Sequence, residues 1–278
     1  MKKSLLFIAL LIISVSSFAQ NIPKKAFYGG LGASYNLVKF SAVDANTLGL
    51  SNVYIDGNLV SSGSAGGPYV FPESTDNRFA PNVQLGYFQL FNNSNWLWGS
   101  KLTYSYIGSK SVSSEIHIPQ VGSVGKSSFT GDAVVQSFEY RVNNQMTLTP
   151  YFGVSVKKAF FYLGPGLSLS ETIENINGVV GYAFIGDKEV NISGAPTDFS
   201  STDWSVGFAA VAGGTYFISS SLFLDYSYTY CQTGTQTNNF TAPFTNSQGP
   251  ISTSGELIGS TSTHEVTNSF TLTLNKIF

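Results

Sequence analysis

The sequence predicts an all-β protein, an eight-stranded antiparallel transmembrane β-barrel with long extracellular loops and short periplasmic turns. Three observations support this fold class. The 278-residue chain is rich in aromatic residues (14%) and glycine (28 residues) but only 11% charged, which favours strands and turns over helices. Several short segments alternate large apolar with small or polar side chains, the pattern typical of membrane strands. The connections between these segments are alternately very short and very long.

Composition and charge exclude several other classes. A disordered chain would be richer in charge and poorer in aromatic residues, and a disulfide scaffold needs more than the single cysteine present. A helical membrane protein would need apolar runs of about 20 residues, which the chain lacks beyond its N-terminus. The formal charge of -2 and the absence of a basic patch argue against a nucleic-acid partner.

The N-terminus has the pattern of a signal peptide. Lys2 and Lys3 precede an apolar run over residues 5–13, and the small residues Ser17 and Ala19 occupy the positions that a signal peptidase recognises. A membrane anchor is the alternative, but the run is shorter than a spanning helix requires. We therefore expect residues 1–19 to be removed on export and residues 20–278 to form one barrel domain.

Eight segments carry the period of two. They cover residues 27–40, 82–91, 96–107, 146–156, 161–169, 204–213, 222–230 and 270–275. In an antiparallel hairpin, opposed residues point to the same side, so the turn length decides which apolar positions must match. Three short turns pass this test, with the expected pairs Leu85–Leu102, Phe152–Leu163 and Tyr216–Leu224.

The large apolar side chains are expected to face lipid. Glycine, serine and threonine occupy the opposite face of each segment, which is the reverse of a soluble sandwich with a bulky core. The segment from Trp96 to Tyr106 has a tilted height of roughly 25 Å, which matches the apolar band of an outer membrane. Aromatic residues near both ends of the segments are candidate interfacial girdles.

The four long connections identify the extracellular end of the predicted barrel. They cover residues 41–79, 108–142, 171–203 and 231–263, and residues 129–142 are expected to continue the strands as a hairpin above the membrane. Pro150 and Pro165 should lie opposite each other on the lipid face. Since proline cannot donate to a strand ladder, we expect a bulge or a missing hydrogen bond there, with a gate as the functional alternative.

Several features of the chain together resemble a known family. They are the signal peptide, the alternating segments, the terminal Phe278, and the motifs Tyr151-Phe152-Gly153 and Tyr162-Leu163-Gly164-Pro165-Gly166-Leu167. The chain resembles the porin-like outer-membrane β-barrel family, of the eight-stranded OmpA and OmpX kind. Lys276 departs from this pattern, because it interrupts the apolar alternation before the terminal aromatic residue. We expect no periplasmic domain after the barrel, so the cell-wall anchoring role of OmpA-type proteins is not expected to carry over.

Lys101 and Asp225 are the candidate lumen charges, because both fall on the inward-facing parity. A charge inside a barrel of eight strands needs a partner, since side chains fill its interior. The two residues either belong to one polar plug, similar to the lumen salt-bridge networks of OmpA-type barrels, or lie separately near the mouths in water. The plug hypothesis predicts that Lys101→Ala loosens the barrel or raises ion leakage.

The remaining motifs do not indicate a catalytic or ligand-binding site. Gly125-Lys126-Ser127 resembles the end of a phosphate-binding loop but lacks the preceding glycine and a strand-to-helix context. His117 and His264 lie near Glu115 and Glu265, and we interpret them as exposed loop residues with no serine-bearing strand beside either histidine. We therefore expect no catalytic, cofactor-binding or metal-ligating residues.

These observations predict a monomeric, non-enzymatic protein of the bacterial outer membrane. Its structural or surface-interaction role would be carried by the long extracellular loops. Its expected partners are outer-membrane lipid and lipopolysaccharide, with an extracellular partner bound through the loops. A small porin-like channel for ions or small solutes is the first alternative, and a lipid-modifying outer-membrane enzyme is the second.

Overall fold

The computed structural model describes residues 22–185 and 188–278, and its secondary structure over these residues is β-strand. The predicted signal peptide, residues 1–19, lies outside the described residues. No helix within these two ranges is long and apolar enough to cross a membrane.

Eight strands form a closed antiparallel ring. Each strand pairs with the next around the ring, and β13 pairs back to β1. In ring order they are β1 (Lys25–Phe40), β4 (Ser74–Leu90), β5 (Trp96–Val124), β6 (Ser127–Val156), β7 (Ala159–Ile185), β9 (Thr197–Phe217), β10 (Leu222–Thr233) and β13 (Glu265–Ile277). Every predicted segment lies in one of these strands, so the predicted eight-stranded barrel is confirmed.

The register follows the turns as predicted. The structure contains all three expected pairs, Leu85–Leu102, Phe152–Leu163 and Tyr216–Leu224. Large apolar side chains on these strands point outward and are exposed, among them Leu85, Leu102, Phe152, Leu163 and Phe208. The apolar face of the sheet is therefore the outer surface of the barrel, where it forms a belt for lipid.

The two prolines of the central hairpin interrupt its ladder. Pairing between β6 and β7 stops after Leu148–Leu167 and resumes at Phe152 with the register unchanged. Pro150 and Pro165 lie within this gap. The predicted loss of hydrogen bonds is therefore confirmed, and no extra residue is inserted at this point.

The apolar belt gives a first prediction. Leu148 is 48% exposed, and it lies on β6 in the middle of the barrel wall beside Leu102 and Leu167. Replacing it with arginine places a charge near the bilayer midplane, which costs about 2–4 kcal/mol. Urea unfolding in lipid vesicles should show this loss for Leu148→Arg. Val121→Arg should leave stability unchanged, because Val121 is 70% exposed above the barrel; equal effects of the two variants would contradict the assignment of the belt.

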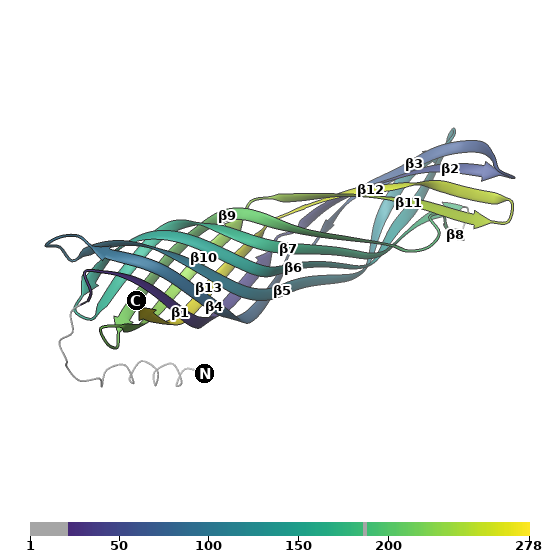
Figure 1. Ribbon diagram of the computed structural model, residues 1–278. Coiled ribbons are helices and arrows are strands. Elements are labelled where there is room, and N and C mark those ends of the chain that lie inside the picture. The colour runs from purple at the N-terminus through teal and green to yellow at the C-terminus, as the bar shows by residue number, and fades with distance from the viewer. Residues whose placement is uncertain (1–21, 186–187) are drawn as a thin grey trace.

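The long connections are mostly strands rather than loops, which corrects the prediction. The expected hairpin is confirmed, because residues 129–142 continue β6 above the membrane and pair with β5. Together with the distal parts of β5, β6, β7 and β9, five further strands build an extracellular extension that continues the barrel away from the short turns (Figure 1). They are β2 (Val43–Ile55), β3 (Asn58–Phe71), β8 (Lys188–Asn191), β11 (Gln236–Gln248) and β12 (Ile251–Thr263). In Figure 1 the C-terminus lies at the end with the short turns, and β2, β3, β11 and β12 reach the opposite tip.

A β-bulge reverses which face of β6 is buried where this strand enters the extension. Along β6, Met146 and Leu148 face outward, whereas Tyr140 and Val142 face the interior although they share the same parity. The register between β6 and β7 shifts between Val142 and Gln145, which inserts one residue. The bulge thus turns the apolar face from the lipid to the interior at the point where the chain leaves the membrane.

The extension has its own hydrophobic core. Its buried side chains come from six strands and meet inside the sheet. They include Val38, Phe40, Phe71, Ile118, Phe138, Tyr140 and Ile176. The rings of Phe71 and Phe138 are stacked with their centroids 4.3 Å apart. The extension is therefore an ordered structure with a packed interior, which the Ser- and Gly-rich composition of these segments did not indicate.

Candidate functional site

Lys101 and Asp225 lie inside the barrel and form an ion pair. Lys101 comes from β5 and Asp225 from β10, and their neighbours Leu102 and Tyr226 point outward to the lipid. The Lys101 Nζ to Asp225 Oδ2 distance is 3.2 Å, and the two side chains are only 3% and 2% exposed. The alternative of two separately solvated charges near the mouths is therefore wrong. The two strands lie far apart in sequence, and only the closed ring brings the charges together.

Every hydrogen of the Lys101 ammonium group has an acceptor. Lys101 Nζ donates to Tyr162 Oη at 2.8 Å, to Ser227 Oγ at 3.1 Å and to Asp225. Tyr162 in turn donates to Asp225 Oδ1 at 2.7 Å, and Gln84 Nε2 donates to Asp225 Oδ2 at 3.2 Å. We call these five residues the lumen network. Because a buried charge pair is tolerated only when its hydrogen-bonding groups are satisfied, this network fits a structural plug.

Glycines make room for the tyrosine rings of the lumen. A Cβ added at Gly213 would lie 2.5 Å from the ring of Tyr162, and one added at Gly99 would lie 2.4 Å from the ring of Tyr151. Each ring thus occupies the space beside a glycine of an adjacent strand. This arrangement explains why small residues alternate with large ones on the inward face: the space left by each glycine is occupied by a neighbour's side chain.

Below the lumen network, next to the short turns, phenylalanine rings fill the barrel. We call this set the aromatic cluster; its buried members are Phe88, Phe160, Phe217 and Phe223. Ring centroids lie 5.3 Å apart for Phe88 and Phe160 and 5.0 Å apart for Phe217 and Phe223. These contacts lie in the range of favourable aromatic packing. The periplasmic end of the lumen is therefore occupied by apolar rings rather than by a water path.

Two carboxylates are buried in the extension, Glu174 and Glu265. Glu265 accepts a hydrogen bond from Tyr140 Oη at 3.2 Å, and Glu174 accepts one from Thr261 Oγ1 at 2.7 Å and one from Asn238 Nδ2 at 2.9 Å. Burial raises the pKa of Glu265 to about 7 and also raises the pKa of Glu174. Both groups are therefore more stable protonated in the folded protein than in the unfolded chain.

These raised pKa values predict that the protein is less stable at neutral than at mildly acidic pH. The folded state holds the Glu265 proton up to about pH 7, whereas the ordinary pKa is 4.5, so stability should fall as the pH rises between these values. Glu265→Gln should remove the penalty and raise stability above pH 7 by on the order of 2 kcal/mol. Urea unfolding in vesicles at a series of pH values measures this effect.

Glu139 supplies a control, because its pKa is lowered whereas that of Glu265 is raised. The guanidinium of Arg141, which is ion-paired with Glu139, is the main cause that lowers the pKa of Glu139. Its contribution is therefore lost as the pH falls through the lowered folded pKa, and Glu139→Gln should not stabilise the protein at neutral pH. A Glu265→Gln variant with the wild-type pH profile would contradict the prediction.

The two histidines do not come together as a pair. His117 Nδ1 lies 3.5 Å from Asp132 Oδ2 on the extension, whereas His264 Nε2 lies 2.9 Å from Ser41 Oγ. No serine-bearing strand was expected beside either histidine, and Ser41 indeed lies in the short connection between β1 and β2 rather than on a strand. Ser41 and His264 meet because Ser41 follows β1, His264 precedes β13, and these two strands pair. Among the described residues, no carboxylate is hydrogen-bonded to His264, so the serine–histidine contact lacks the third group of a catalytic triad.

The other motifs also take structural positions. Gly125 and Lys126 form the turn between β5 and β6 at the tip of the extension, with Gly125 at φ +60°, so no helix follows them. Within residues 22–185 and 188–278, no group of three or more histidine, cysteine, aspartate or glutamate side chains is placed to hold a metal ion.

Sequence analysis missed most of the lumen. The aromatic residues assigned to the girdle near the short turns, such as Trp96 and Phe161, are exposed. Phe88, Phe160, Phe217 and Phe223 were not considered, and they point inward. Their parity carried the signal, because Phe160 shares the inward parity of Tyr162 and Phe223 that of Asp225. Parity placed Lys101 and Asp225 on the inward face, but it could not decide whether they meet or identify Tyr162, Ser227 and Gln84 as partners, since it gives the face of a side chain and not its height in the barrel.

No protein-family model and no curated protein matches the chain. Solved structures with similar folds include the attachment invasion locus protein Ail of Yersinia pestis, with 14% identity, 80% of this chain and 99% of that chain covered, and a TM-score of 0.30. Neisserial surface protein A has 11% identity, coverage of 82% and 97%, and a TM-score of 0.29. Outer membrane protein OprG from Pseudomonas aeruginosa has 10% identity, coverage of 92% and 99%, and a TM-score of 0.30.

Proposed function

We propose that this chain, an eight-stranded β-barrel of the bacterial outer membrane, is a non-enzymatic surface protein that makes its interactions through the extracellular extension. The observation that carries the proposal is the filled lumen. The aromatic cluster occupies the periplasmic end, and the lumen network above it has no free donor on Lys101. The barrel interior thus serves the fold, and the extension presents the accessible surface.

The extension suits an interaction role because it is ordered and exposes apolar side chains to water. Leu59 and Val60 follow the β2–β3 turn and are exposed, as are Leu50 and Val70 on the same two strands. Exposed aliphatic residues on a rigid sheet offer contact area to a partner at little cost in conformational entropy. We expect an extracellular macromolecule to bind this surface, with outer-membrane lipid and lipopolysaccharide around the belt below it.

The two alternatives find less support. A porin-like channel requires a water path past four packed phenylalanine rings and the buried Lys101–Asp225 pair. A lipid-modifying enzyme would have to use Ser41 and His264, which lack an orienting carboxylate. A loss of lipid A deacylation or acyl transfer in His264→Ala cells would favour the enzyme over our proposal.

The proposal is tested by shortening the extension. The β2–β3 and β11–β12 hairpins are replaced by short turns, and folding of the barrel is checked by heat-modifiable gel mobility. We then expect cells that express the shortened protein to lose attachment to a panel of immobilised matrix proteins and polysaccharides, compared with cells that express the full chain. Equal attachment by a folded, surface-displayed short form would contradict an interaction role for the extension.

A further inference from the structure

A cavity of about 470 Å³ lies at the tip of the extension, outside the lumen described above. Strand ends from β2, β5, β6, β7, β8, β11 and β12 surround it, so segments distant in sequence line one cavity. Its apolar walls are supplied by Val53, Val124, Phe129, Val190, Ile192 and Ile251. The volume falls in the range of sites that enclose small-molecule ligands.

Small inward side chains on two strands leave space at the tip. On β7, the buried Ile176 and Val179 are followed by Gly181 and Ala183, which line the cavities of the tip. On β2, the buried Val43 is followed by Gly49 and Ser51. The same strands that fill the lower extension thus leave space at its end, although larger residues would have closed it.

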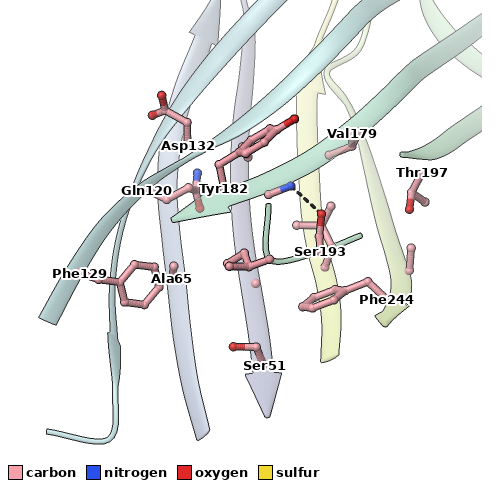
Figure 2. Close-up of a pocket in the computed structure, with 16 residues that line it drawn as sticks. Ser51, Ala65, Gln120, Phe129, Asp132, Val179, Tyr182, Ser193, Thr197 and Phe244 are labelled. Atoms are coloured by element: carbon pink, nitrogen blue, oxygen red, sulfur yellow. Dashed lines mark hydrogen bonds between the residues drawn. The ribbon is translucent and has the colours of Figure 1, made fainter. Parts of the chain in front are cut away.

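A second, narrower cavity of about 60 Å³ adjoins the first and leads toward the packed core. The two share Ser51, Phe129 and Ile192 as lining residues. Figure 2 shows this inner cavity with Phe129 and Phe244 beside it and with Ser193 accepting a hydrogen bond from the Gly181 amide at 2.7 Å. The shared walls favour an elongated occupant over a compact one.

The side chains that line the larger cavity disfavour a charged ligand. None of the described residues that line it has an ionisable side chain; its polar groups are hydroxyls and amides, such as those of Ser128, Asn246 and Gln248. A charged ligand would lose its hydration without gaining a counter-ion, which is costly, whereas an apolar body gains from burial.

We propose that the tip cavity binds an uncharged amphiphile with an elongated apolar body and a hydroxyl-type head group. The apolar body lies between the strand ends, and the head group meets the amide and hydroxyl groups that line the cavity. This inference rests on the proposed function only in placing the ligand on the extension, and the attachment assay above does not depend on this cavity.

The test uses the full chain in lipid nanodiscs with a dodecanol that carries a photoreactive diazirine. After irradiation, mass spectrometry maps the labelled residues, and labelling of the membrane belt around Leu163 serves as an internal standard for probe in the lipid. We expect saturable labelling of residues 124–129 and 190–192 that unlabelled dodecanol competes away. Labelling confined to the belt would overturn the proposal.

Cavity-filling variants make the test specific. Ala183→Trp should lower labelling of the tip about tenfold or more, because the indole ring occupies the space that the apolar body needs. Val53→Trp fills the cavity from the facing strand and serves if the first variant fails the gel-mobility test. Val121→Trp adds the same ring to an exposed position and should leave labelling unchanged. A dodecanoate that carries the same diazirine serves as the charged counterpart of the dodecanol probe. Tip labelling that persists in a folded filling variant, or equal tip labelling by the dodecanoate and the dodecanol, would also overturn the proposal.

Discussion

Lys101→Met should destabilise the barrel by about 3–5 kcal/mol, because it leaves the Asp225 carboxylate buried without its cation. The lost ammonium group also removes the hydrogen bonds to Tyr162 and Ser227. The methionine side chain keeps most of the volume of lysine, so the effect reports the lost charge rather than a cavity. Urea unfolding in lipid vesicles measures the loss.

Two further variants separate the ion pair from general damage. The double variant Lys101→Met/Asp225→Asn carries no unpaired charge and should recover most of the lost stability. Lys110→Met removes an exposed lysine whose distance to Glu139 is 3.9 Å, and it should change stability by less than about 1 kcal/mol. If Lys101→Met unfolds like Lys110→Met, the lumen network does not stabilise the barrel.

Phe160→Ala should cost about 3–5 kcal/mol by opening a cavity in the aromatic cluster. The Phe160 ring is 1% exposed and packs against Phe88 and Phe217, with centroids 5.3 and 6.2 Å away. Neighbouring strands hold the cluster in a closed ring and cannot collapse into the space that the missing ring leaves. The measurement is again urea unfolding in vesicles, with heat-modifiable gel mobility as a check of folding.

The adjacent residue supplies the matched control. Phe161 is 59% exposed on the lipid side of the same strand, so Phe161→Ala removes an identical ring without opening an internal cavity. We expect a clearly smaller loss than for Phe160→Ala. A larger loss at Phe161 would mean that the two faces of β7 have been assigned the wrong way round.

The barrel wall was predictable because its side-chain period is two and its turns are short. Once Leu85 faces Leu102 across a short turn, the parity of both strands is set. The inward position of Lys101 and Asp225 followed from the same rule. The contact between Lys101 and Asp225 did not follow from this rule. It depends on the register of every strand pair between β5 and β10 around the closed ring, and alternation carries no information on these registers.

The extension could not be predicted from alternation alone. Its strands keep the apolar parity of the membrane segments in β6, yet the bulge between Val142 and Gln145 reverses which face is buried. The pair Asn143-Asn144 interrupts the alternation at this point and was the available signal. Long segments rich in serine and glycine, such as β3, carry a weak alternation signal of their own, and in the structure β3 pairs with β2 and β5.

Ion conductance in planar bilayers tests the central claim, that side chains fill the lumen, most directly. With the aromatic cluster and the lumen network in place, we predict that the wild-type protein inserts without stepwise conductance at moderate voltage. Uniform conductance steps from folded, wild-type protein would contradict a filled lumen. The function would then be that of a channel rather than an interaction through the extension.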